Sequence, residues 1–217
     1  MKKYKAILFD MDGTLTDSAP GITRGVAYTL KKYGIEPPEL DELKKFIGPP
    51  LGESFEKYYG IDRKNFLETE RIFREYYDTT GIFENSLFDG VTEMLAGLKK
   101  ADKFIATASS KPIMHVKRII EHFGIAEFFD YIGAADFDNG IIEKEDVLSK
   151  LLADTKLLPS ECLMVGDRLY DIKGAHKNSI DCMCVLYGFG SRKEFEEYGA
   201  DYVAETVEEL SAFLLAT

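Results

Sequence analysis

Ile7-Leu8-Phe9-Asp10-Met11-Asp12-Gly13-Thr14 is the stretch around which the rest of the chain can be interpreted. An apolar run ends abruptly in two acids one residue apart, and a glycine follows. Alternate side chains of an extended segment point the same way, so Asp10 and Asp12 can project toward one site. Gly13 can adopt backbone angles closed to other residues and lets the chain turn at once. The stretch therefore predicts a strand that ends in a sharp turn carrying two carboxylates.

Two carboxylates crowded at a strand end repel each other and lose hydration. They require a cation, a shared proton or water, and a hard divalent metal with oxygen ligands would satisfy them. The simpler alternative is a strand end whose acids only solvate a turn. The motifs further along the chain decide between these two interpretations.

Length and composition limit what the chain can be. A chain of 217 residues with 45% hydrophobic residues is long enough for one large domain, or for a core domain with a modest insertion. The formal net charge of -11 argues against a nucleic acid or an anionic membrane surface as partner. No apolar run reaches about 18 residues, and the N-terminal MKKYKAILFD is a strand interrupted by acids rather than a signal peptide. We therefore expect a cytoplasmic protein.

The cysteines and histidines offer no clear site. Three cysteines without a CxxC pair fit a reducing compartment. Cys182 and Cys184 alternate with Met183 inside an apolar run, which is typical of buried strand residues. The three histidines have no zinc-type spacing, so we assign them no catalytic role.

The segment after the first strand has the pattern of helices. Ile22, Val26 and Leu30 recur at helical spacing, which predicts an amphipathic helix over residues 19–33 that Gly34 closes. Pro37-Pro38 then breaks the chain, and further helical patterns follow at residues 40–46, 51–59 and 63–80. Strand-like alternation is absent between residues 17 and 88. A helical block is therefore inserted after the first strand.

From residue 89 on, short apolar strands alternate with helices. Helices are predicted at residues 91–100, 113–123, 144–155 and 171–177, and strands at 103–109, 130–134, 161–165, 181–186 and 201–203, before a final helix. Such alternation predicts a parallel sheet with helices on both faces. The expected fold class is α/β: a doubly wound, Rossmann-like parallel sheet core of residues 1–16 and 89–217, with an inserted α-helical domain at residues 17–88.

In such sheets, ligands bind beyond the carboxyl ends of the strands. Asp10 ends the first strand, Ser109-Ser110-Lys111 ends the next, and Gly166-Asp167-Arg168 follows the strand at 161–165. Lys144 lies near the start of the helix after the strand at 130–134. Acids, hydroxyls and a lysine from four separate segments are therefore expected at one edge of the sheet.

These segments resemble, in order and in type, the four motifs of the haloacid dehalogenase (HAD) superfamily. Residues 9–14 (FDMDGT) are similar to its first motif, residues 106–112 (ATASSKP) to the second and residues 143–147 (EKEDV) to the third. Residues 165–175 (VGDRLYDIKGA) look like the fourth motif in its GDxxxD form. Each motif alone is weak, but four in order at strand ends identify the chain as similar to this superfamily over nearly its whole length.

The resemblance implies a phosphatase that forms an aspartyl-phosphate. Asp10 would be the nucleophile that attacks phosphorus. Mg²⁺, bound by Asp10, by the backbone carbonyl of Asp12 and by Asp167, would keep Asp10 ionised and screen it from the anionic phosphate. Asp12 would protonate the leaving alkoxide and later take a proton from the attacking water, so it must first be protonated.

The resemblance also implies which residues hold the phosphoryl group. Ser109 would donate a hydrogen bond to a phosphoryl oxygen, with the backbone N–H groups of Gly13 and Ser110 beside it. Lys144 would supply positive charge to the transferring group. Asp171 would support the site by holding metal-bound water or the lysine.

Several of these roles have simpler alternatives. Asp171 can act only as a cap of the helix that starts beside it. Lys144 lies in the charged run EKED, which is typical of a solvated surface. Ser109-Ser110 stands where related phosphatases commonly have Thr-Asn. Serine keeps the hydroxyl at position 109, so only contacts of the side chain at position 110 are in doubt.

The helical block falls where one HAD subgroup carries a helical cap. A mobile lid over the site would exclude bulk water, with hinges at residues 16–18 and 84–89. Gly48, Pro49 and Pro50 form a turn between two helices that resembles the substrate-facing loop of phosphoglycolate-phosphatase-like members, although an ordinary helix connector is the alternative. Arg24, on the first helix, is a candidate contact for a substrate carboxylate or phosphate.

The expected activity is hydrolysis of a small phosphorylated metabolite, as in phosphoglycolate phosphatases. A 5'-nucleotidase and a β-phosphoglucomutase-like phosphotransferase on the same core stay open, as does a non-catalytic domain that binds a phosphorylated ligand. Dehalogenases of the superfamily lack the second acid of the first motif, so Asp12 argues for phosphoester chemistry. A response-regulator receiver domain does not fit, because Asp167 follows the lysine and a helical block interrupts the sheet.

Overall fold

The computed structural model describes residues 2–217, apart from the side chain of Arg63. These residues divide into two compact units. An α/β unit contains the chain up to Thr16 and Leu87–Thr217, and a helical unit contains Asp17–Ser86. The chain passes between the units through two short strands, β2 (Thr16–Asp17) and β3 (Ser86–Leu87), which form a two-stranded sheet. The second boundary lies two residues earlier than the sequence predicts.

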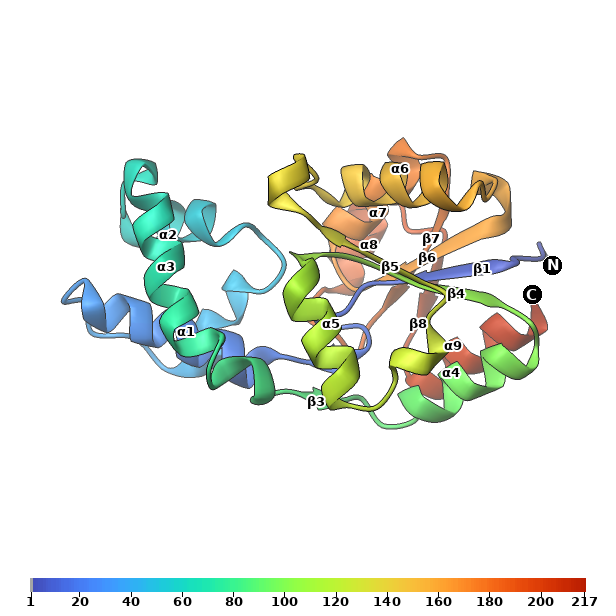
Figure 1. Ribbon diagram of the computed structural model, residues 1–217, viewed down its shortest axis with the longest axis horizontal. Coiled ribbons are helices and arrows are strands. Elements are labelled where there is room, and N and C mark those ends of the chain that lie inside the picture. Colours follow the sequence, from blue (N-terminus) through green and yellow to red (C-terminus); the bar gives the residue numbers. More distant parts are fainter. Residues whose placement is uncertain (1) are drawn as a thin grey trace. The chain divides into compact units, whose positions relative to one another are not determined.

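The α/β unit is built on a six-stranded sheet with the order β5-β4-β1-β6-β7-β8 (Figure 1). Its strands are β1 (Ala6–Phe9), β4 (Phe104–Pro112), β5 (Tyr131–Ala135), β6 (Cys162–Gly166), β7 (Asp181–Val185) and β8 (Tyr202–Ala204). Every neighbouring pair in this sheet is parallel. Strand order runs outward from β1 in both directions, so the expected doubly wound parallel sheet is confirmed.

Strand β1 lies in the middle of the sheet because all four of its residues are apolar and buried. Ala6 and Leu8 belong to a core on one face of the sheet. Ile7 and Phe9 are also fully buried, and alternation along the strand directs them to the other face. The end of β1, which carries Asp10, is therefore held by packing on both faces.

Helices cover both faces of the sheet. In Figure 1, α6 (Lys144–Thr155) and α7 (Leu169–Lys177) lie above the sheet, whereas α4 (Val91–Lys100) and α9 (Val207–Ala216) lie below it. The unit also contains α5 (Ile113–His122), α8 (Arg192–Tyr198) and the 3-10 turns η4 (Ala126–Phe128), η5 (Phe137–Asn139) and η6 (Pro159–Glu161). Val147, Ile172 and Phe195 join α6, α7 and α8 to one buried cluster on the sheet. In the described part of the chain, none of the helices has the length and apolar character needed to span a bilayer.

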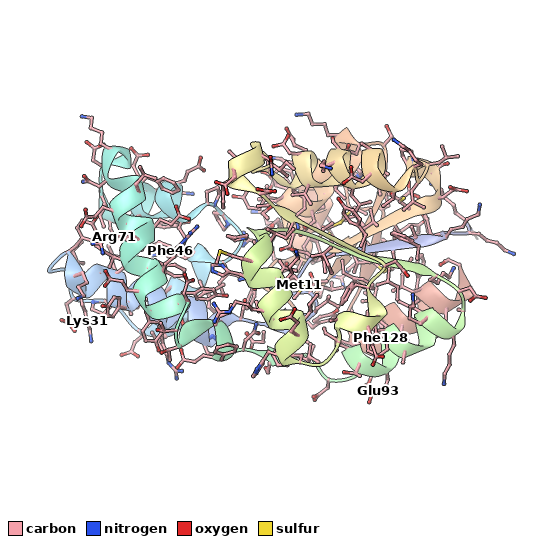
Figure 2. The ribbon with its side chains drawn as sticks, viewed as in Figure 1. Met11, Lys31, Phe46, Arg71, Glu93 and Phe128 are labelled. Atoms are coloured by element: carbon pink, nitrogen blue, oxygen red, sulfur yellow. The ribbon has the colours of Figure 1, made fainter. Side chains whose placement is uncertain are left out.

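The helical unit contains α1 (Ala19–Lys32), η1 (Leu40–Phe46), α2 (Leu51–Tyr59), η2 (Arg63–Asn65), α3 (Phe66–Tyr77) and η3 (Gly81–Phe83). Part of its core is aromatic. The ring of Phe46, labelled in Figure 2, lies 4.9 Å from the ring of Phe55 and 5.6 Å from that of Tyr58, centroid to centroid. Edge-to-face and tilted ring pairs of this kind add to the gain from burial.

Three segments differ from the sequence prediction. Residues 40–46 form a 3-10 helix, in which the N–H of Ile47 donates to the carbonyl of Lys44, and a seven-residue pattern does not separate this from an α-helix. The helix predicted at residues 63–80 becomes η2 followed by α3, which ends at Tyr77. Helix α8 was not predicted. Its buried residue is Phe195, and a single apolar residue does not produce the repeating pattern that predicts a helix.

Candidate active site

Polar side chains from neighbouring strands meet at the carboxyl edge of the sheet. Asp10 directly follows β1, and its N–H donates to the carbonyl of Val165 in β6 at 2.9 Å. Ser109 lies in β4, and Asp167 directly follows β6. Because β4 and β6 flank β1 and run parallel to it, these three positions lie at one edge. This is the edge where the sequence predicts the site.

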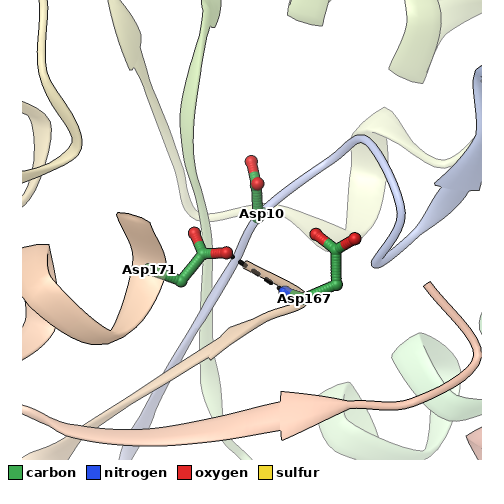
Figure 3. Close-up of side chains that lie close together, drawn as sticks. All are labelled: Asp10, Asp167 and Asp171. Atoms are coloured by element: carbon green, nitrogen blue, oxygen red, sulfur yellow. Dashed lines mark hydrogen bonds between the residues drawn. The ribbon is translucent and has the colours of Figure 1, made fainter. Parts of the chain in front are cut away.

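Asp10, Asp167 and Asp171 form a cluster of acids, shown in Figure 3. One carboxylate oxygen of each lies within 4.8 Å of the others. Asp167 and Asp171 are almost completely buried. Burial raises the pKa of Asp167 well above its ordinary value, and the charges of Asp171 and Asp10 raise it further. A cation bound among these carboxylates would relieve their repulsion.

Lys144 already supplies one cation to this cluster. Its ammonium group lies 2.9 Å from Oδ1 of Asp10 and 2.8 Å from Oδ1 of Asp171, and it donates to the carbonyl of Ala108 at 2.6 Å. The side chain is only 4% exposed, so the surface alternative for this lysine does not apply. Burial alone would lower the pKa of Lys144, but the two carboxylates outweigh burial and raise it. Lys144 is a buried cation beside Asp10.

Asp171 combines two contacts that the sequence offered as alternatives. Its Oδ2 accepts the backbone N–H of Asp167 at 3.1 Å and that of Arg168 at 3.0 Å, at the start of α7. Its Oδ1 pairs with Lys144. Burial raises the pKa of Asp171, and Lys144 offsets part of that rise. One carboxylate thus caps the helix and holds the lysine.

Asp12 is not a member of the acid cluster. Its Oδ2 lies 3.0 Å from Nζ of Lys111, whose side chain is 6% exposed. Its Oδ1 is buried and has no hydrogen-bond partner within the described residues. A buried polar atom without a partner is uncommon and often marks a functional position. Asp12 therefore differs from Asp10 in its surroundings, and its role as the proton donor stays a prediction.

The backbone angle and the close neighbours of position 13 require a glycine there. Its φ of 79° lies in the left-handed region, and a Cβ at this position would lie 2.1 Å from Oδ2 of Asp167. Ser109 is buried, with its Oγ accepting the N–H of Lys111 at 3.3 Å. Ser110 is half-buried. The phosphate-binding roles of these three residues stay predictions.

The predicted specificity residues lie in the helical unit. Arg24, on α1, forms an ion pair with Glu84 at 2.5 Å and is 47% exposed. Gly48 has a φ of 103°, and Pro50 directly precedes α2, so Gly48, Pro49 and Pro50 connect η1 to α2. A substrate contact by Arg24 or by this loop stays a prediction.

Residues 187–190, Tyr-Gly-Phe-Gly, are a part of the site that the sequence interpretation missed. The N–H of Phe189 donates to Oδ2 of Asp167 at 2.7 Å. A Cβ on Gly188 or Gly190 would lie 2.5 Å or 2.0 Å from atoms of Asp167. A signal was present, because aromatic residues and glycines alternate from the second residue after β7, whose carboxyl end lies at the same edge. Such glycines often mark a close approach of two backbones.

Proteins of similar sequence are known. The family described as haloacid dehalogenase-like hydrolase matches residues 7–185. A 5'-nucleotidase from Pseudomonas aeruginosa is 40% identical over 196 residues, which cover 90% of this chain and 89% of that protein. The tyrosine-protein kinase PtkA from Mycobacterium tuberculosis is 37% identical, over 94% of this chain and 70% of the kinase. A phosphoglycolate phosphatase from Photobacterium profundum is 28% identical, over 97% and 96% of the two chains.

A solved structure has the same fold. A predicted phosphatase from Clostridium acetobutylicum matches with a TM-score of 0.95 and 40% identity, over 99% of this chain and all of the other. The family match contains all four sequence motifs, from the Asp10–Asp12 turn to the loop that carries Asp167. The chain therefore belongs to the haloacid dehalogenase-like hydrolases, as its motifs predicted.

Proposed function

We propose that the chain is a Mg²⁺-dependent phosphatase that hydrolyses small phosphomonoesters through a phosphorylated Asp10. One observation carries this proposal. Asp10 directly follows the central strand and lies close to a buried acid, Asp167, and a buried cation, Lys144. This arrangement offers a carboxylate nucleophile, a place for a metal ion and a fixed positive charge. Relatives named phosphatase and nucleotidase support the same class of reaction.

The donor set fits a magnesium ion. Oδ1 of Asp167 is buried and has no hydrogen-bond partner in the described part of the chain, and a carboxylate of Asp10 lies nearby. Both oxygens of Asp171 are already engaged, by Lys144 and by backbone amides. We therefore assign Asp10, Asp167 and the backbone carbonyl of Asp12 as ligands, and Asp171 as their support. When bound, Mg²⁺ neutralises negative charge on the nucleophile and on the phosphate.

The first step transfers the phosphoryl group to Asp10. A carboxylate oxygen of Asp10 attacks phosphorus, the bond from phosphorus to the ester oxygen breaks, and Asp12 gives its proton to the leaving alkoxide. Lys144, the hydroxyl of Ser109 and the backbone N–H groups of Gly13 and Ser110 stabilise the oxygens of the transferring group.

The second step regenerates the enzyme. Asp12 takes a proton from a water molecule, the water oxygen attacks phosphorus, and the bond between phosphorus and Asp10 breaks. Inorganic phosphate leaves, and Asp12 again carries a proton, which comes from the water and replaces the one that left with the alcohol. In the structure, Lys111 occupies one oxygen of Asp12. Proton transfer therefore uses the oxygen without a partner, Oδ1.

The helical unit is proposed as a cap that encloses the substrate, with Arg24 and the loop at residues 48–50 as specificity contacts. The substrate is proposed to be a small phosphorylated metabolite. Phosphoglycolate is one candidate, and nucleoside 5'-monophosphates are favoured by the 40% identity to a 5'-nucleotidase. The three free, buried cysteines support the proposed cytoplasmic location.

The catalytic assignment is tested with p-nitrophenyl phosphate. The purified protein should release p-nitrophenol with Mg²⁺, lose this activity in EDTA and regain it when Mg²⁺ is restored. Asp10→Asn should abolish turnover, because the amide is a poor nucleophile and a weaker metal ligand. Asp138→Asn, at an exposed position in η5, is the matched control and should retain wild-type activity. Turnover by Asp10→Asn at the wild-type rate would refute the mechanism.

The substrate class is tested with a panel of phosphorylated metabolites compared by kcat/KM. The panel includes phosphoglycolate, nucleoside 5'-monophosphates and hexose phosphates. Release of inorganic phosphate identifies a hydrolase, whereas isomerisation of a hexose phosphate would identify a mutase. Because one relative is named a tyrosine-protein kinase, ATP is included, and we expect no net transfer of its phosphate to tyrosine.

A further inference from the structure

The first turn of α7 is the structural base of the acid cluster, since it connects Asp167 to Asp171. A helix start has several backbone N–H groups without partners in the helix. Asp171, within α7, accepts the N–H of the N-cap residue Arg168 and that of Asp167, which precedes it. The next N–H, from Leu169, is taken by Oε1 of Glu194 at 2.7 Å. A residue 25 positions away thus completes the cap of this helix.

Glu194 also holds the side chain of Arg168. The guanidinium Nε of Arg168 donates to the same Oε1 at 3.1 Å. The two side chains are 17% and 18% exposed, so the pair is largely shielded from water, where charge-assisted bonds are stronger than at an open surface. Glu194 therefore binds the side chain of Arg168 and the backbone of Leu169, the two residues directly after Asp167.

The position of Glu194 is itself fixed by helix α8. Ser191 is the N-cap of α8, and its Oγ accepts the N–H of Glu194 at 3.2 Å. In a common capping motif, the acid at this position bonds back to the N-cap residue. Glu209, at the same position of α9, also bonds locally, because its carboxylate accepts the N–H of Glu205, the residue before the N-cap Thr206. The carboxylate of Glu194 instead reaches across to α7.

The segment between β7 and α8 holds Asp167 from its other side. The N–H of Phe189 donates to Oδ2 of Asp167, which leaves Oδ1 for a metal. Gly190 packs against the backbone of Asp167, where a Cβ would lie 2.0 Å from the carbonyl oxygen. Residues 189–194 therefore contact the carboxylate and the carbonyl of Asp167, and they also contact Arg168 and Leu169, the two residues that follow it.

We propose that Glu194 is a positioning residue of the metal site, which fixes the backbone that presents Asp167 by holding the Leu169 amide and the Arg168 guanidinium. The inference rests on the proposed function, because it assumes that Asp167 binds Mg²⁺. Partners that orient a metal ligand commonly contribute about 10- to 100-fold to metal affinity. Loss of the Glu194 carboxylate should therefore weaken Mg²⁺ binding even though Glu194 touches no metal.

The test measures Mg²⁺ binding to the full chain by isothermal titration calorimetry. Glu194→Ala should raise the Kd for Mg²⁺ by about 10-fold. Glu194→Gln keeps an oxygen that accepts the Leu169 N–H, so its Kd should stay within about threefold of wild type. Glu197→Ala, at an exposed position on the same helix, removes the same charge and should bind Mg²⁺ like wild type.

A second variant removes the same hydrogen bond from the other side. Leu169 is the first residue of α7, where proline is tolerated, and Arg168 has the extended conformation that precedes proline, with φ -133° and ψ 162°. Leu169→Pro should therefore fold and should also raise the Kd. Thermal unfolding in EDTA checks that each variant is folded.

The outcomes separate this inference from the proposed function. If the wild-type protein bound no Mg²⁺, the proposed metal site would be wrong. If the wild type bound Mg²⁺ and both Glu194→Ala and Leu169→Pro bound it equally well, only the positioning role of Glu194 would be overturned. An equal loss in Glu194→Ala and Glu197→Ala would also overturn it, because the effect would then come from net charge.

Discussion

The ammonium group of Lys144 lies 2.9 Å from Oδ1 of Asp10, with both side chains largely removed from water. The lysine comes from the start of α6 and the aspartate from the end of β1. Lys144 pairs with Asp171 at nearly the same distance. One buried cation therefore pairs with two acids of the cluster, so its removal is predicted to affect both stability and activity.

Lys144→Met should lower kcat by at least about 100-fold, because it removes positive charge from the transferring phosphoryl group. It should also lower the free energy of unfolding by about 3 kcal/mol, because removing one partner of a buried ion pair leaves the other uncompensated. Steady-state kinetics and thermal unfolding in EDTA measure the two effects.

Lys150→Met is the matched control for this prediction. Lys150 lies on the same helix and pairs with Asp154, but its side chain is 50% exposed. Exposed pairs contribute about 0–1 kcal/mol, so activity and unfolding temperature should change little. Equal effects of the two substitutions would show that helix α6, rather than the buried charge, is responsible.

Gly13→Ala should reduce activity by at least about 100-fold through displacement of Asp167. The new Cβ would lie 2.1 Å from Oδ2 of Asp167, so the turn or the carboxylate has to move. A shift of about 1 Å in a catalytic group can lower the reaction rate by about 100-fold. Activity on p-nitrophenyl phosphate and the Kd for Mg²⁺ are the measurements.

Gly124→Ala separates backbone strain from this displacement. Gly124 has a φ of 66°, close to that of Gly13, but a Cβ there would meet nothing within 4 Å. It should cost about 1–2 kcal/mol of stability and leave activity intact. Full activity in Gly13→Ala would contradict the proposed contact with Asp167.

Much of the fold and of the site could be predicted from local signals. Apolar strands alternating with amphipathic helices indicate the sheet, and acids directly after β1 and β6 indicate the edge at which they meet. The burial of Lys144 was not readable from EKED, because its partners, Asp10 and Asp171, are distant in the sequence. Glu194 lies in a short helix with little apolar pattern, and its partners are visible only once α7 and α8 pack together.

Arg24→Ala should raise KM for the preferred substrate by at least about fivefold while kcat stays within about twofold. Its ion pair with Glu84 is 47% and 23% exposed, so the loss of stability should stay below about 1 kcal/mol. A substrate contact would therefore be seen in KM rather than in unfolding. Arg71→Ala, which breaks exposed pairs with Glu68 and Glu75, is the control. An unchanged KM for Arg24→Ala would exclude Arg24 from the substrate site.

Asp167→Asn should stabilise the metal-free protein and abolish Mg²⁺ binding. Asp167 is fully buried beside two other acids, and an amide removes this repulsion while its oxygen can still accept the N–H of Phe189. A gain of about 1 kcal/mol would raise Tm by about 2–4 °C in a chain of this size. Thermal unfolding in EDTA and in excess Mg²⁺ measures both effects, with Mg²⁺ raising the Tm of the wild type alone.

The pH dependence of this gain identifies Asp167 as its source. Burial raises the pKa of Asp167 well above its ordinary value of 3.8. At pH values between 3.8 and the raised pKa of the folded protein, Asp167 has released its proton in the unfolded chain but still holds it in the folded chain. The stability of the metal-free wild type therefore falls as pH rises. Asparagine does not titrate, so the Tm difference between Asp167→Asn and wild type should be small near pH 4 and should grow toward neutral pH. A difference that is constant with pH would mean that the substitution acts through packing rather than through the buried charge.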